Sequence, residues 1–92
     1  MPGTYSQLLY HIVFATKHRH PWITPELSIR LYPFIGGIIR KQNAILFDIG
    51  GIEDHIHLYL STRPDTAISD LMRHVKSRST KWVRQNFPTH SE

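Results

Sequence analysis

The sequence predicts an α+β fold with the element order β-α-β-β-α, in which an antiparallel sheet carries two helices on one face. Two patterns predict it: three short segments in which apolar residues alternate, and two longer segments in which they recur at helical spacing. With 92 residues the chain is at most one small domain. The order is that of a ferredoxin-like, RRM-like split βαβ unit short of its final strand.

The three strands are predicted from period-two alternation. The first covers residues 5–16, YSQLLYHIVFAT; the second is AILFDIG; and the third is HIHLYLS, after a turn or bulge at Gly50-Gly51. The residues expected to face inward are Leu8, Tyr10, Ile12 and Phe14, then Ile45, Phe47 and Ile49, then Ile56, Leu58 and Leu60. The third strand would therefore show His55, His57, Tyr59 and Ser61 on the other face.

The first helix is predicted to begin after Thr24 and to run to about Lys41. Thr24 is a suitable N-cap, and Pro25 suits the first helical position, where its missing N–H costs nothing. Pro33 and the Gly-Gly pair that follows interrupt the pattern, so we expect a kink or a restart near Tyr32.

The second helix follows the turn sequence RPDT, and either Asp65 or Thr66 is expected to cap it. Its predicted buried stripe consists of Ile68, Leu71, Met72, Val75, Trp82 and Val83. Residues 71–88 carry five bases and no acid: Arg73, Lys76, Arg78, Lys81 and Arg84. A segment of one sign favours a polyanion as partner, although a solvated helix face explains it equally well.

Composition excludes several classes of protein. The chain has no cysteine, which rules out a disulfide framework and a thiolate zinc site. No apolar run approaches the ~20 residues that a membrane span needs, and the N-terminus lacks a signal-peptide pattern. We expect a cytoplasmic protein without a membrane partner.

The stretch EDHIHLYL holds the most specific candidate site. His55 and His57 alternate on one strand, so both imidazoles share a face and could converge on a metal ion or a phosphate. Imidazoles alone suit zinc, copper, iron or nickel, whereas added carboxylates favour manganese or magnesium. Glu53 and Asp54 are expected to be supporting or loop acids rather than ligands. His11 would share the face if the first and third strands are neighbours.

Three segments together carry a family resemblance: YHIVFATKHRHPWIT, EDHIHLYLS and SDLMRHVKSRSTKWVRQNFP. In this order they resemble the single-tyrosine HUH transposases of the IS200-like group, which include the REP-associated tyrosine transposases. HUH stands for His, hydrophobic, His, which here is His55, Ile56 and His57. The match extends over nearly all 92 residues and implies an RRM-like core.

The resemblance implies a DNA transposase that binds a single-stranded DNA hairpin. It assigns His55 and His57 as ligands of a divalent ion, Mg²⁺ or Mn²⁺, held against the scissile phosphate. A tyrosine from a later helix attacks that phosphate and forms a covalent phosphotyrosine. Family members are homodimers. The resemblance also implies DNA contacts from Lys17, Arg19, Arg73, Lys76, Arg78 and Lys81.

The tyrosines of this chain depart from the family pattern. They are Tyr5, Tyr10, Tyr32 and Tyr59, and all precede or lie on the HUH strand. We therefore expect residues 1–92 to be a single HUH transposase domain truncated before the tyrosine helix, without the last strand. We expect no catalytic residue in it and no cleavage of DNA by it.

Two other classes of function remain open. One is a non-catalytic module on the same fold that binds single-stranded nucleic acid; such sheets use aromatic residues on the open face, where the sequence offers Tyr59 and little else. Trp22 and Trp82 could stack on bases, but packing is the plainer interpretation. The other class is a small metal-binding or structural dimerisation domain whose basic helix is only a solvated surface.

Overall fold

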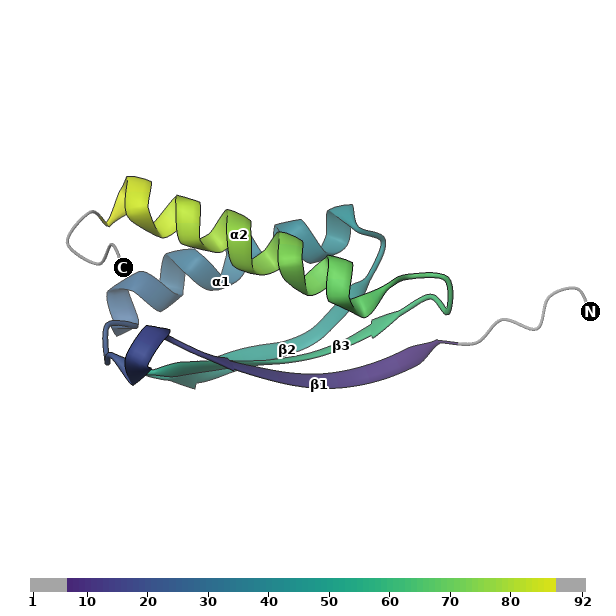
Figure 1. The fold of residues 1–92 in the computed structure, drawn as a ribbon, viewed down its shortest axis with the longest axis horizontal. Coiled ribbons are helices and arrows are strands. Elements are labelled where there is room, and N and C mark those ends of the chain that lie inside the picture. The colour runs from purple at the N-terminus through teal and green to yellow at the C-terminus, as the bar shows by residue number, and fades with distance from the viewer. Residues whose placement is uncertain (1–6, 88–92) are drawn as a thin grey trace, which may run out of the picture.

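The computed structural model describes residues 7–87 and confirms the predicted α+β fold (Figure 1). The elements are β1 (Leu8–Ala15), the short 3₁₀ helix η1 (Lys17–Arg19), α1 (Pro25–Lys41), β2 (Ile45–Ile52), β3 (His55–Thr62) and α2 (Ile68–Asn86). The strands form an antiparallel sheet in the order β1-β3-β2, and both helices cover one face of it. Residues 5 and 6 of the predicted first strand lie outside the described residues.

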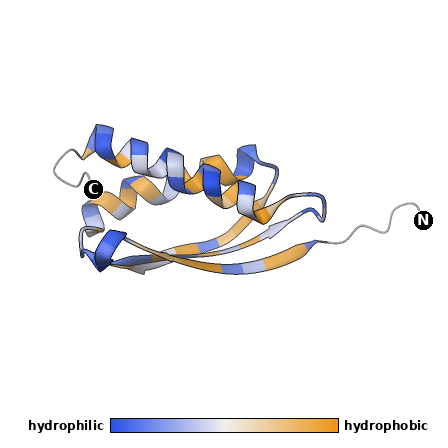
Figure 2. Ribbon diagram, in the orientation of Figure 1, coloured by the Kyte–Doolittle hydropathy of each residue, from blue (hydrophilic) through white to orange (hydrophobic). Residues whose placement is uncertain are grey.

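The core lies between the sheet and the two helices. Ile56, Leu58 and Leu60 of the central strand β3 are 4%, 0% and 0% exposed, as the alternation predicts. They pack with buried residues of both helices, among them Leu27, Ile35, Ile39, Leu71, Val75 and Val83. Figure 2 shows hydrophobic residues along the strands and on both helices. Neither helix in residues 7–87 has the length and apolar character that crossing a membrane requires.

Helix α1 begins and ends as predicted, and it runs without interruption. The Leu27 N–H donates to the Thr24 hydroxyl at 3.2 Å, which confirms Thr24 as the N-cap. The expected restart near Tyr32 is wrong, because one helix runs through Pro33 to Lys41. Pro33 has no N–H to donate to the carbonyl of Ile29 one turn earlier. Because Ile29 is exposed, water can donate to that carbonyl instead.

Helix α2 begins one or two residues later than predicted, since its capping residue is Ala67, without a side-chain hydrogen bond, and not Asp65 or Thr66. Asp65 instead lies 3.7 Å from Arg63 in an ion pair, and the backbone N–H of Thr66 donates to the Arg63 carbonyl at 3.0 Å. Both expected caps therefore belong to the turn that precedes the helix. The predicted capping was wrong because it ignored this competing turn.

Strand β2 contains a β-bulge at Phe47, and the bulge overturns part of the predicted facing. Leu46 pairs with Leu60 and Asp48 pairs with Tyr59, so Phe47 is the extra residue. Ile45 and Phe47 were expected inward, but they are 47% and 53% exposed, whereas Leu46 packs against the core. Ile49, after the bulge, packs against the core as predicted.

The hairpin between β2 and β3 turns at Glu53 and Asp54, not at the two glycines where the turn or bulge was expected. Gly50 and Gly51 are both part of β2. Gly51 has a φ of 156°, and a Cβ there would lie 2.1 Å from the His55 carbonyl oxygen. This close approach of two backbones requires a glycine.

Candidate metal and nucleic-acid site

The two histidines of the His-Ile-His stretch lie on the open face of the sheet. His55 and His57 alternate on β3 with the buried Ile56, and the helices cover the opposite face. His55 lies between Ala15 of β1 and Ile52 of β2, and His57 between Val13 and Gly50. The central position of β3 therefore puts both imidazoles in the middle of an uncovered surface.

Each histidine has a carboxylate partner. Nδ1 of His55 is 3.1 Å from Oδ1 of Asp54, and Nε2 of His57 is 3.4 Å from Oδ2 of Asp48. A carboxylate can only accept, so each of these ring nitrogens is the donor. Asp54 thus acts as the supporting acid that the sequence suggested. Asp48 was missed as a partner of His57: the alternation with Ile49 inward already placed it on the open face, but the sequence did not show which residue of β3 lies beside it.

Gly50 leaves room for the ring of His57. A Cβ at position 50 would lie 3.0 Å from Cε1 and 3.2 Å from Nε2 of His57, closer than side chains normally approach. Gly50 faces His57 directly in the register of β2 and β3. The imidazole therefore occupies space that any other residue at position 50 would partly fill.

The open face also carries a row of rings. His11 of β1 is 5.8 Å from His57 and 6.4 Å from Tyr59 between ring centroids, both in edge contacts. Phe47 is 5.6 Å from Tyr59 on the other side. The sequence interpretation placed Tyr59 almost alone on this face. That expectation was wrong, because the bulge brings Phe47 beside it.

The fit of a divalent ion rests on the histidines and their partners. Within residues 7–87, no group of three or more metal-ligating side chains is close enough to hold an ion, so His55 and His57 would supply two ligands. Asp54 accepts from Nδ1 of His55, which leaves Nε2 of that ring with its lone pair. This is the carboxylate–histidine arrangement that usually supports a metal ligand.

The basic residues predicted to contact DNA fall into separate groups. Arg73, Lys76 and Lys81 line one open groove along α2, together with Arg84. Arg78 is not among the residues that line this groove.

The two basic residues of η1 also differ in their surroundings. Lys17 lines a cavity shared with Lys76, on the helix side of the sheet. Arg19 is directed to the histidine site instead, with its Nε 3.5 Å from Oδ2 of Asp54. The predicted DNA contacts thus lie on both sides of the sheet.

The tyrosines of the described chain take different surroundings. Tyr10 and Tyr32 pack against the core, and burial raises the pKa of Tyr32 above its ordinary value of 10.0. Tyr59 is 42% exposed on the histidine face. Tyr5 lies outside the described residues.

The fold and the site define a class of protein: an α+β domain whose open sheet carries a His-hydrophobic-His motif on its central strand, with a basic helix behind it. The chain belongs to a family of this class. The family described as "Transposase IS200 like" matches residues 4–92. The resemblance given by the three sequence segments is thereby confirmed.

Relatives and one solved structure show the extent of the similarity. The ISDra2 transposase TnpA of Deinococcus radiodurans is 28% identical over 90 residues, which cover 98% of this chain and 64% of the relative. The transposase for insertion sequence element IS200 of Salmonella typhimurium is 30% identical over 82 residues, which cover 85% of this chain and 51% of the relative. The chain thus spans roughly half to two thirds of the curated relatives' length.

The structural similarity is higher than the sequence identity suggests. A crystal structure of a candidate transposase from Deinococcus radiodurans R1 has a TM-score of 0.90 with this chain at 27% sequence identity. The alignment covers 97% of this chain and 68% of that one. The three-stranded sheet and its two helices are therefore the shared part of both folds.

Proposed function

We propose that the protein acts in DNA transposition of the single-tyrosine HUH type, with His55 and His57 as ligands of Mg²⁺ or Mn²⁺. When bound, the ion would polarise a phosphoryl oxygen of the DNA and orient it as a Lewis acid. Asp54 would fix the orientation of the His55 ring, and Gly50 would keep space for His57. The presence of carboxylates near the imidazoles suits the harder ions.

The observation that carries this proposal is the shared facing of His55 and His57 on the open sheet, each with a carboxylate partner. A histidine pair kept for packing would be expected to turn toward the core. Here the same strand buries Ile56 and Leu58 and leaves the imidazoles uncovered. Membership of the transposase family gives this arrangement its interpretation.

The DNA partner is proposed to be a single-stranded hairpin, bound through phosphates. The groove of α2 lined by Arg73, Lys76, Lys81 and Arg84 offers a row of cations. Such contacts release counterions, so affinity would fall steeply with salt. This partner agrees with the cytoplasmic location predicted from the sequence, which stays a prediction.

Residues 1–92 are proposed to bind DNA and position a phosphate without cleaving it. Tyr10 and Tyr32 pack against the core and are poorly placed to attack a phosphate. Tyr59 lies on the histidine face, but the family pattern gives it no nucleophilic role. A covalent protein–DNA adduct, formed with a hairpin and Mn²⁺ and seen on a denaturing gel, would contradict this part of the proposal.

Fluorescence anisotropy of a labelled single-stranded hairpin tests the DNA proposal. A linear duplex of matched length is the comparison, and both are titrated at two salt concentrations, with and without Mn²⁺. We expect a preference for the hairpin that weakens as salt rises. Equal affinity for both DNAs would contradict hairpin recognition by these residues.

A non-catalytic module for single-stranded nucleic acid is the second candidate, and the Phe47–Tyr59 contact favours it. Exposed aromatic rings on an open sheet can stack on bases. The test measures affinity for single-stranded DNA in two variants. If the double variant His55→Ala, His57→Ala binds the DNA unchanged without Mn²⁺, while Phe47→Ala loses binding, this candidate is favoured over the first.

We also propose a homodimer formed through sheet edges. In the described residues, β1 and β2 are the outer strands, and each pairs only with β3. Unpaired edges favour association with another strand. Light scattering at high protein concentration should give the mass of a dimer, and a monomeric mass would contradict the proposal.

A further inference from the structure

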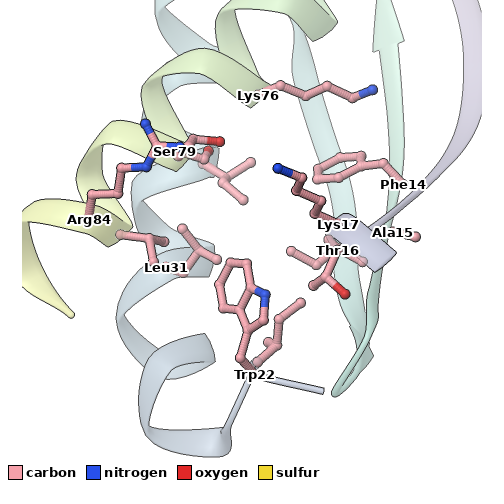
Figure 3. A pocket seen from close by; sticks show the side chains of 14 residues that line it. Phe14, Ala15, Thr16, Lys17, Trp22, Leu31, Lys76, Ser79 and Arg84 are labelled. Atoms are coloured by element: carbon pink, nitrogen blue, oxygen red, sulfur yellow. The ribbon is translucent and has the colours of Figure 1, made fainter. Parts of the chain in front are cut away.

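A cavity of about 340 Å³ lies on the helix side of the sheet, away from the histidine face. It is bounded by the end of β1, η1, the loop before α1, and one side of each helix (Figure 3). Its apolar floor consists of core residues that include Leu31, Ile35 and Val83. The volume falls at the lower end of the ~300–1,000 Å³ usual for ligand pockets.

The charge of this cavity has one sign. Lys17, Lys76 and Arg84 line it, and no aspartate or glutamate does. Figure 3 shows Lys17 and Lys76 reaching toward the Phe14 side of the cavity from η1 and α2. Lys76 Nζ is 5.8 Å from the centroid of the Phe14 ring, and neither lysine forms an ion pair within the described residues. Such a rim suits an anionic group.

The walls of the cavity are aromatic and include a buried hydroxyl. Phe14 and Trp22 both line it and present ring surface to whatever enters. Ser79, which is 8% exposed, also lines it, and its hydroxyl has no hydrogen-bond partner in residues 7–87. A buried hydroxyl without a partner costs free energy, which a ligand polar group could recover.

We propose that this cavity binds one nucleotide, with the base between Phe14 and Trp22 and the phosphate at Lys17 and Lys76. A simple anion would not need aromatic walls, and a simple apolar ligand would not need the cations. The nucleotide is either a free mononucleotide or one residue of a DNA strand. The inference builds on the proposed nucleic-acid binding and adds a site for a base, separate from His55 and His57.

Quenching of Trp22 fluorescence tests the site directly. The variant Trp82→Phe leaves Trp22 as the only tryptophan, and circular dichroism checks its fold. Each deoxynucleoside monophosphate is titrated, with inorganic phosphate and the matching nucleoside as comparisons. We expect saturable quenching by a monophosphate, weaker quenching by the nucleoside and none by phosphate.

Substitutions then locate the phosphate. Lys76→Gln in the same background should weaken mononucleotide binding roughly tenfold, because a charge-assisted contact is lost. Arg78→Gln is the matched control, because it removes a charge from the same helix outside the cavity lining. Equal effects of both variants would contradict the assignment. If Trp82→Phe does not fold, amide chemical shifts of Thr80 and Ile35 in the natural protein supply the same readout.

A second experiment separates the two sources of the nucleotide. Each nucleotide of the DNA hairpin is replaced in turn by an abasic residue, and affinity is measured by anisotropy. If removing one base of the hairpin lowers the affinity strongly, and the same removal has no such effect in a Ser79→Val variant, the cavity binds a base of the strand. Mononucleotide binding without such a position indicates a free nucleotide.

Two negative outcomes have different meanings. In the first, the protein binds the hairpin, but no mononucleotide quenches Trp22 and no abasic replacement lowers the affinity. This outcome would overturn the nucleotide site and leave the proposed function standing. Quenching by a mononucleotide with no hairpin binding at any salt concentration would overturn the proposed DNA function and leave the nucleotide site.

Discussion

The two sides of the sheet differ in chemistry although they share one central strand. On the open side, β3 shows His55 and His57 with their carboxylate partners. On the helix side, the same strand buries Ile56, Leu58 and Leu60, with Thr62 at its end, and the cations lie one layer farther out, on α2. The groups that would hold an ion and those that would hold phosphates are therefore separated by the core.

This separation limits how DNA could bind. A strand that passes the end of the sheet at η1 would meet cations on both sides. Lys17 lines the cavity on the helix side, whereas Arg19 pairs with Asp54 beside the histidines. Two residues of one short helix thus belong to opposite sides of the sheet.

The largest expected effect concerns stability and separates the two sides of β3. Leu58→Ala should lower the free energy of unfolding by ~2–5 kcal/mol, because Leu58 is fully buried. His57→Ala should change it far less, since His57 faces the open side. Urea unfolding followed by circular dichroism measures both. Similar losses for the two variants would mean that His57 is a structural residue.

The second prediction concerns the metal ion. Asp54→Asn should weaken Mn²⁺ binding by about 10–100-fold, because the His55 ring loses its charged acceptor. Asp65→Asn is the control, because Asp65 pairs with Arg63 in a separate turn. Calorimetric titration of Mn²⁺ into each variant measures the difference. If Asp54→Asn binds Mn²⁺ as tightly as the control, Asp54 does not support a metal ligand.

The third prediction tests the helix side alone. Lys81→Gln should reduce the slope of log affinity against log salt by about 1 for single-stranded DNA, since one phosphate contact is lost. Arg78→Gln should leave the slope unchanged, because Arg78 does not line the groove of α2. Anisotropy at four salt concentrations gives both slopes. An equal reduction would show that charge acts without regard to position on the helix.

The smallest expected effect concerns alkaline pH. Burial raises the pKa of Tyr32 above 10.0 in the folded protein, so the unfolded chain loses this proton first as pH rises. Stability should therefore fall above about pH 10, and Tyr32→Phe should remove that part of the fall. Urea midpoints from about pH 9 to about pH 11 measure it, with Tyr59→Phe as the exposed control. A pH dependence unchanged by Tyr32→Phe would contradict the assignment.

The sequence predicted those features that depend on local periodicity. The facing of β3 and the cap at Thr24 were both correct, because alternation and capping act within a few residues. The places of Leu46 and Phe47 were not predictable in this way. They depend on which residue of β2 pairs with which residue of β3, and that pairing is set by the whole sheet.

The candidate site shows the same limit. The HUH motif identified His55 and His57 without any structure, but their surroundings come from other segments. Gly50 was interpreted as part of a turn or bulge, whereas it makes space for His57 from the neighbouring strand. The cavity of Lys17 and Lys76 joins residues nearly sixty positions apart. Only tertiary packing brings such residues together.

The bulge at Phe47 divides β2 into two segments whose side chains alternate out of step. Leu46 before it and Ile49 after it both reach the core, although a regular strand would turn them to opposite sides. Deleting Phe47 would leave the pairing of both halves in place and make β2 a regular strand, because Leu46–Leu60 and Asp48–Tyr59 are consecutive pairs. The bulge is therefore a place where β2 can lose a residue without moving Asp48 away from His57, and what such a deletion would remove is the ring beside Tyr59.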